Sequence, residues 1–261
     1  MKQELLLESG LHDLRLSRFV LSYQSLAQEA ARSNLSYERY LLALVQEEVA
    51  HRQAGRIERA IGEARFPVLK DLADFDWSCV PSIAKPRILE LAGGAYIDSH
   101  EPVILVGNPG LGKSHVACGL ALSACRQGRR VRFYNVAGLV NDLIKAQQEY
   151  QLSRLMTRLC KYDLLVLDEL GFIPFTAVGA QLLFQLCSAL YERVALIITT
   201  NLRFAEWSSV MGGDERMSAA LLDRLTHRAT ILEFVGTSYR FRQQLHRQEG
   251  KEGEMPPQEP V

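Results

Sequence analysis

Long apolar runs are missing from this sequence of 261 residues. No stretch approaches the ~20 apolar residues that a membrane-spanning helix needs. The opening residues, MKQELLLESG, contain neither the long apolar region nor the small-residue cleavage site of a signal peptide. These absences predict a cytoplasmic protein without a membrane partner.

Cysteine is scarce, and net charge is absent. The five cysteines are widely spaced and none forms a C-x-x-C pair, which favours reduced thiols over disulfides or a zinc site. The 30 basic residues balance 30 acidic ones. A passive nucleic-acid coat would carry a basic excess, so the charge balance argues against that class, whereas DNA binding through a local patch stays open. The cysteines are Cys79, Cys118, Cys125, Cys160 and Cys187.

A glycine-rich stretch, GNPGLGKS, stands between a short β-branched segment and a segment of helical length. Gly107, four residues, and then Gly112-Lys113-Ser114 have the spacing of a P-loop. Its backbone N–H groups and the start of the next helix can surround phosphates. Lys113 can reach the β- and γ-phosphates, and Ser114 can bind Mg²⁺. We therefore predict ATP and Mg²⁺ binding. The nucleotide-binding residues are Gly107, Asn108, Pro109, Gly110, Leu111, Gly112, Lys113, Ser114 and His115.

Short apolar strands and helical segments alternate beyond the P-loop. The strands are expected at 131–136, 163–170, 194–201 and 229–234, in addition to the one before the loop. This alternation predicts an α/β fold with a five-stranded parallel sheet between helices.

Polar residues follow two of these strands, where parallel sheets carry their sites. Asp168 and Glu169 come after LLVL, so Asp168 is predicted to hold Mg²⁺ through water, and Glu169 to orient and deprotonate an attacking water. Asn201 ends the stretch TTN and could sense the γ-phosphate, although Thr and Asn are also ordinary strand-end caps.

The first ~75 residues have helical periodicity. Arg52, Arg56 and Arg59 share one side of a long helix there, as a solvated face or as a ridge for DNA or a partner. The expected domains are residues 1–75, a helical domain for self-association, partner or DNA contact; 76–245, an ATPase domain; and 246–261, a disordered tail.

These motifs resemble those of the AAA+ ATPases: GNPGLGKS is similar to Walker A, LLVLDE to Walker B and TTN to sensor 1. FDWSCVPSIAKPRILELA, DELGFIPFT, LLDRLTHRATILEF and GTSYRFR make the chain more similar still to the IstB-like helper ATPases of bacterial insertion sequences, relatives of the DnaC-type helicase loaders. The resemblance implies an AAA+ core in a bacterial cytoplasmic protein.

The resemblance also implies an arginine finger at Arg224, with Arg228 as a rival. About 27 residues follow ATILEF, too few for the small helical lid common in AAA+ proteins, so the lid is expected to be largely absent. A half-open site would be completed by a neighbouring subunit, where Arg224 would act in trans.

The resemblance implies DNA-contacting residues in the helical segment between the second and third strands. Lys145, Arg154 and Arg158 are the candidates, and a solvated face is the alternative. Such contacts would be largely independent of sequence.

The leading hypothesis is a DNA-dependent ATPase that hydrolyses ATP to ADP and phosphate, assembles on double-stranded DNA as a higher-order oligomer and recruits a transposase. The alternatives are a DnaC-type helicase loader, an ATP-gated non-catalytic DNA scaffold and a small-molecule kinase.

Overall fold

The computed structural model of this protein describes residues 2–239. The chain divides into two compact units, Met1–Arg59 and Ala60–Val261. The expected disordered tail lies outside the described residues, as does most of the segment where a lid is expected to be missing. None of the helices within the described range has both the length and the apolar character needed to cross a membrane.

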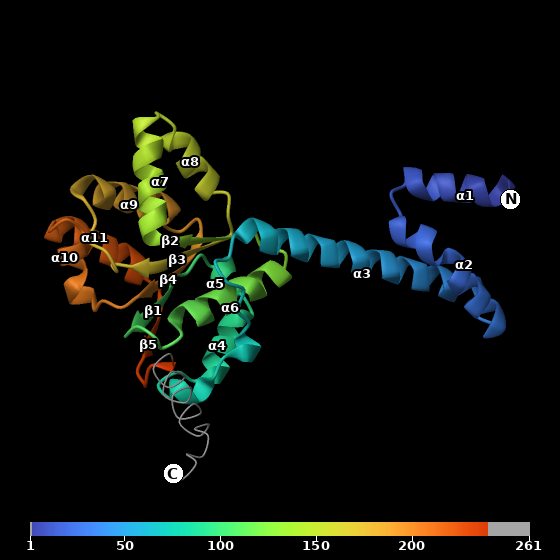
Figure 1. Ribbon diagram of the computed structural model, residues 1–261, viewed down its shortest axis with the longest axis horizontal. Helices are drawn as coiled ribbons and strands as arrows, with labels where there is room; N and C mark the ends of the chain where they lie inside the picture. Colours follow the sequence, from blue (N-terminus) through green and yellow to red (C-terminus); the bar gives the residue numbers. More distant parts are fainter. Residues whose placement is uncertain (1, 240–261) are drawn as a thin grey trace, which may run out of the picture. The chain divides into compact units, whose positions relative to one another are not determined.

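The first unit is built from helices, which confirms the expectation of a helical N-terminal region. It contains α1 (Lys2–Asp13), α2 (Ser17–Arg32) and most of α3 (Tyr37–Ala64). Helix α2 lies along the first half of α3 (Figure 1). The backbone N–H of Arg18 donates to the Glu48 carboxylate at 2.9 Å, and the Tyr40 hydroxyl donates to the Tyr23 carbonyl at 3.1 Å.

The second unit contains a five-stranded parallel sheet, as the sequence predicts. Its order is β2-β3-β4-β1-β5, and every neighbouring pair is parallel. All carboxyl ends therefore meet at one edge of the sheet. The strands are β1 (Val103–Gly107), β2 (Val131–Asn135), β3 (Leu164–Leu170), β4 (Ala195–Thr200) and β5 (Thr230–Phe234).

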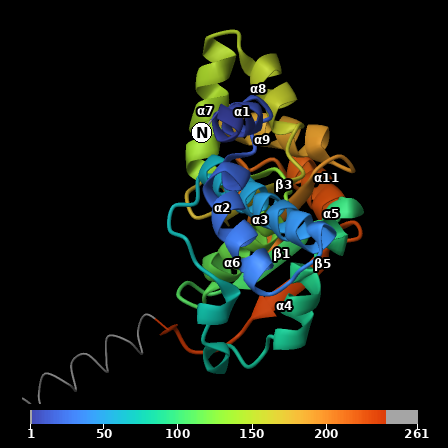
Figure 2. The same cartoon turned by 90° about the vertical axis from the view of Figure 1, so that its right-hand side faces the viewer.

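Helices cover both faces of the sheet. Because side chains alternate along a strand, β1 sends Val103 and Leu105 to one core and Ile104 to the other. Helices α4 and α6 lie on the opposite side of the sheet from α7 and α8 in both views (Figures 1 and 2). The helices are α4 (Lys85–Ala92), α5 (Ala95–Asp98), α6 (Lys113–Arg126), α7 (Val136–Gln148), α8 (Leu152–Leu159), α9 (Ala177–Leu190), α10 (Trp207–Val210) and α11 (Glu215–Thr226).

The proline-bearing segment at 67–86 has the composition of a linker, but it packs into the core of the second unit. It forms two short 3₁₀ turns, Leu72–Asp74 and Trp77–Cys79. Leu72 is buried against Gly119 of α6, where a larger residue would leave no room. The few apolar residues of this segment therefore place it beside the P-loop.

Candidate functional site

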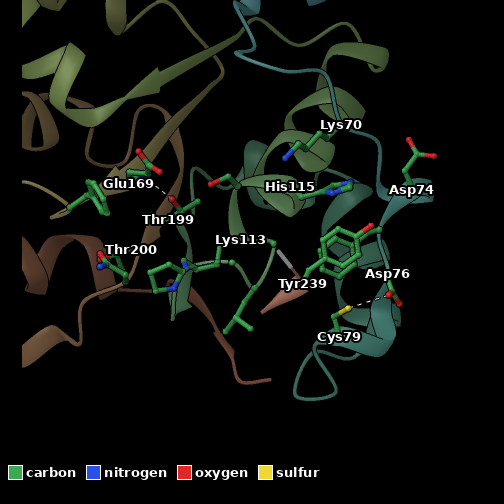
Figure 3. Close-up of a pocket in the computed structure, with 18 residues that line it drawn as sticks. Lys70, Asp74, Asp76, Cys79, Lys113, His115, Glu169, Thr199, Thr200 and Tyr239 are labelled. Carbon is green, nitrogen blue, oxygen red and sulfur yellow. Dashed lines mark hydrogen bonds between the residues drawn. The ribbon is translucent and has the colours of Figure 1, made fainter. Parts of the chain in front are cut away.

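A pocket of about 450 Å³ opens at the carboxyl edge of the sheet. The P-loop forms its floor. Figure 3 shows Glu169, Thr199 and Thr200 on one side of Lys113, and Tyr239, Asp76 and Cys79 on the other. Segments that are distant in the sequence thus line one cavity.

The P-loop is shaped around the Lys113 ammonium, which donates to the carbonyls of Gly107 at 2.6 Å and Asn108 at 2.8 Å. Gly112 caps helix α6 at φ +85°, and the Phe75 ring occupies the space that a Cβ atom there would need. Only glycine fits such a position. The positive end of α6 therefore faces the pocket, as a phosphate site requires.

Asp168 lies buried beside the P-loop, and it is only 7% exposed. Its Oδ1 accepts from the Ser114 hydroxyl at 2.7 Å and from the Thr199 hydroxyl at 2.6 Å. A hydroxyl and a carboxylate are hard oxygen ligands of the kind Mg²⁺ prefers. No group of three or more His, Cys, Asp or Glu side chains suited to a metal occurs within residues 2–239. Mg²⁺ held by one or two protein ligands keeps several waters and binds substrate phosphates, which is compatible with Ser114 and Asp168.

Glu169 projects from the strand at a distorted position. Its φ is +62°, and the register between β3 and β4 shifts between Leu167 and Leu170. A non-glycine residue in this region costs about 1–3 kcal/mol, a strain that commonly occurs at functional sites. The exposed carboxylate accepts from the Asn135 side-chain amide at 2.8 Å, and the Glu169 N–H donates to the Thr199 hydroxyl at 2.9 Å.

Sequence reasoning missed Asn135, although the rule that found Asp168 could have found it. Asn135 ends β2 and pairs in register with Asp168 of β3. Its side-chain carbonyl also accepts from Ala137 N–H at the start of α7. One amide thus caps a helix and holds Glu169. Asn201, which was predicted, lines the pocket directly after β4.

The wall opposite Glu169 was also missed, because its residues come from the segment with linker-like composition. The segment has neither the hydrophobic period of a helix nor that of a strand, so no sequence pattern indicates a binding surface there. Phe75 meets His115 edge-on with ring centroids 5.2 Å apart. His115 Nε2 donates to the Asp71 carbonyl at 2.7 Å, and Arg126 pairs with the Asp71 carboxylate at 2.6 Å. The wall also includes Lys70, Asp74, Asp76 and Cys79 of the same segment, and Tyr239, which follows β5.

Arg224 does not line the pocket of its own chain. It lies near Pro102 and Val194, the residues just before β1 and β4, and therefore at the opposite edge of the sheet. Its guanidinium is 5.0 Å from the Phe184 ring centroid and donates to the Ala220 carbonyl at 2.9 Å. Arg228 lies at the same edge, 3.8 Å from Glu101.

The three predicted DNA-contacting residues share a groove of about 780 Å³ between α7 and α8. Lys145, Arg154 and Arg158 are all exposed there, and the structure adds Lys161. Asp142 and Glu149 also line the groove, and Lys145 is 3.9 Å from Glu149. The groove therefore carries four basic and two acidic side chains.

The fold and the pocket define a P-loop ATP-binding protein of the AAA+ class. The chain's fold matches that of DnaI at a TM-score of 0.53 and 16% identity, over 64% of this chain and 91% of that one. It matches AMPPCP-bound DnaA from Aquifex aeolicus at 0.51 and 17%, over 74% and 58% of the two chains. At these identities the likeness shows the fold alone.

The chain belongs to the family of IstB-like ATP binding proteins, whose model matches residues 9–247. A relative from Pseudomonas aeruginosa, named for ATP binding in insertion sequence IS21, is 37% identical over 91% of this chain and 89% of its own length. One from Geobacillus stearothermophilus, named likewise for IS5376, is 33% identical over 91% and 94%. The protein is thus an ATP-binding protein of the insertion-sequence type.

Proposed function

We propose that this protein hydrolyses ATP, assembles on double-stranded DNA and recruits the transposase of its insertion sequence. The observation that carries the proposal is the pair Asp168-Glu169 at the P-loop, with Glu169 held by Asn135 at 2.8 Å. A carboxylate at this position suits deprotonation of a water, whereas a purely binding site has no need of it.

The residues divide the work of hydrolysis as follows. The Lys113 ammonium exchanges its two backbone carbonyls for β- and γ-phosphate oxygens, since charged acceptors make stronger hydrogen bonds. Ser114 and Asp168 would hold Mg²⁺, which would supply positive charge next to the phosphates. Glu169 accepts the proton of the attacking water, and Asn201 orients that water against the γ-phosphate.

DNA binding is assigned to the groove between α7 and α8, because its four basic side chains can contact phosphates. One neighbour in fold, a DnaA, is bound to AMPPCP and single-stranded DNA. We assign double-stranded DNA to this chain because a transposase inserts into duplex target. A DnaC-type helicase loader remains the second candidate, since the same ATP pocket would serve either partner. The insertion-sequence relatives favour a transposase partner.

The deciding experiment measures ATP hydrolysis with and without duplex DNA for the wild type and for Glu169→Gln. We expect the variant to bind ATP normally and to hydrolyse it at least about 100-fold more slowly, so that its complexes on DNA persist. Glu90→Gln removes a surface carboxylate paired with Arg87 and serves as the control. A wild type that binds ATP and DNA without turnover would be a scaffold, and capture of replicative helicase in place of transposase would identify a loader.

A further inference from the structure

The turn between α7 and α8 carries a side chain that the rest of the structure leaves uncovered. Tyr150 is 97% exposed, more than any other large hydrophobic residue within residues 2–239. Its ring therefore has almost no contact with the rest of the described chain. Single exposed apolar residues are ordinary on protein surfaces. Two features of this turn, its backbone and its charge, set Tyr150 apart from them.

The first feature is the backbone, because Tyr150 has a φ of +56°. Its N–H donates to the Gln147 carbonyl at 3.2 Å, and the Gln151 N–H donates to the Ala146 carbonyl at 2.7 Å. Helices that end in this way usually have glycine where Tyr150 stands, since glycine adopts a positive φ without strain. The seven other non-glycine residues with positive φ among the described residues are all Arg, Asn, His or Glu. Only at Tyr150 does such a position carry a phenol ring.

The second feature is the charge beside the turn. Glu149 and Gln151, the neighbours of Tyr150 in the sequence, both line the groove between α7 and α8. The ring therefore lies at the end of a groove that carries four basic side chains. Glu149 is 3.9 Å from Lys145, which offsets its negative charge. The basic residues are Lys145, Arg154, Arg158 and Lys161.

The hairpin of α7 and α8 holds this turn in a fixed place. Leu143 of α7 and Leu159 of α8 are fully buried in the same hydrophobic core. The turn lies at the end of the hairpin that points away from the sheet (Figure 1). A ring presented on a rigid support loses little freedom when it binds.

We propose that Tyr150 inserts its ring between two base pairs of duplex DNA from the minor groove, while the basic side chains hold the flanking phosphates. The inference rests on the proposed binding of DNA by the groove between α7 and α8. The minor groove is about 6 Å wide and a helix is about 10–12 Å across, so the turn and its ring can enter where the helices cannot. Proteins that bind in this groove combine basic side chains with a wedge of this kind. Insertion should be easiest at pyrimidine–purine steps, which unstack most readily.

The ring and the basic side chains should differ in how their contributions depend on salt. Phosphate contacts release counterions and weaken as the salt concentration rises, whereas stacking of a neutral ring on a base releases none. Loss of the ring should therefore lower the affinity for duplex DNA without changing its salt dependence. Loss of Arg154 or Arg158 should change both.

The test measures binding of the full-length chain, with AMPPCP and Mg²⁺, to a duplex of G·C pairs that contains a single TA step. Tyr150→Asn should weaken binding by about tenfold with an unchanged slope of log K against log salt. Asn tolerates a positive φ, so this variant should fold at least as well as the wild type. Tyr150→Phe keeps the ring and should bind like the wild type. The control is Leu89→Gln, which removes an exposed apolar side chain of α4 and should also leave binding unchanged.

Permanganate oxidation reports on the insertion itself, because it attacks thymines that have lost their stacking. The wild type and Tyr150→Phe should make the thymines of the TA step reactive, and Tyr150→Asn should leave them protected. The inference is overturned if Tyr150→Asn binds the duplex as tightly as the wild type, if its salt slope falls, or if the wild type makes no thymine reactive.

Two further outcomes would assign the ring differently. A wild type that binds no duplex at all would overturn the proposed DNA binding and this inference together, whereas the outcomes above leave the proposed DNA binding intact. Loss of transposase binding by Tyr150→Asn at unchanged DNA affinity would overturn the inference and assign the ring to the transposase.

Discussion

The two edges of the sheet differ in what they can do. The carboxyl edge gathers the P-loop, Glu169 and Asn201 around one pocket, with Asp168 hydrogen-bonded to Ser114 of the loop. The opposite edge holds Arg224, whose guanidinium rests on the Phe184 ring. Each edge has what the other lacks, and a single chain cannot bring them together. A head-to-tail contact between copies would join them, which is how heterologous assemblies grow into rings or helices.

The largest expected effect comes from disabling the carboxyl edge. Lys113→Ala removes the ammonium that the P-loop carbonyls hold at 2.6 and 2.8 Å. We expect ATP affinity to fall by at least about 100-fold, and hydrolysis and assembly on DNA to be lost with it. Titration with a fluorescent ATP analogue measures this. Lys70→Ala, which changes another lysine of the pocket, should have a much smaller effect.

Disabling the opposite edge should leave ATP binding intact. Arg224→Ala is expected to bind ATP like the wild type but to hydrolyse it about 10³-fold more slowly on DNA, because the neighbour's γ-phosphate loses a cation. Mixing it with Lys113→Ala protein should restore part of the activity, since some interfaces then pair an intact P-loop with an intact arginine.

The matched control for that mixture is Arg228→Ala, which changes the other arginine of this edge. Its hydrolysis should stay near the wild-type rate. If Arg224→Ala alone hydrolyses ATP normally on DNA, the two edges do not cooperate and the arginine is structural. A mixture that assembles without activity would show that Arg224 is not the finger acting in trans, and Arg228 would be tested next in the same way.

A smaller effect, on affinity for duplex DNA, is expected from the groove between α7 and α8. This groove takes part in neither ATP binding nor hydrolysis. Replacing Arg154 and Arg158 by Ala should weaken duplex binding by roughly tenfold and reduce the slope of log K against log salt by about two. Arg87→Ala, on α4, is the control. ATP affinity should not change. A salt slope equal to that of the wild type would remove these arginines from the DNA interface.

The smallest effect, on the free energy of unfolding, is expected at the pocket wall opposite Glu169, which residues 67–86 form. Backbone hydrogen bonding from Ala73 and the Arg126 side chain lower the pKa of Asp71. The ionised form is therefore favoured in the folded protein, and its contribution is present above about pH 4 and is lost as the pH falls through the lowered pKa. Asp71→Asn should cost about 0.5–1 kcal/mol in urea unfolding at pH 7.

The difference in unfolding stability between the wild type and Asp71→Asn should disappear in acid. Once Asp71 is protonated, wild type and Asp71→Asn should unfold at similar urea concentrations. A difference that persists at low pH would show that the carboxylate charge is not what holds the wall to α6.

Much of the ATP pocket could be predicted from local sequence. The P-loop spacing requires only neighbouring residues, and the strand-end rule located Asp168, Glu169 and Asn201 because all parallel strands end at one edge. Asn135 obeys the same rule, since it closes β2 beside Asp168 and holds Glu169. No such rule could locate the wall opposite Glu169, since the position of Phe75 depends on packing against Gly112 at the start of α6.

The sequence by itself determined the alternation of strands and helices, the P-loop and the acids that follow β3, because spacing and hydrophobic period are local properties of the chain. Only the tertiary structure decided that Asn135 and Glu169 meet, that the segment after residue 66 lines the ATP pocket, and that Arg224 lies at the far edge of the sheet. These depend on strand order and on side chains distant in sequence filling the same space, which no local pattern encodes.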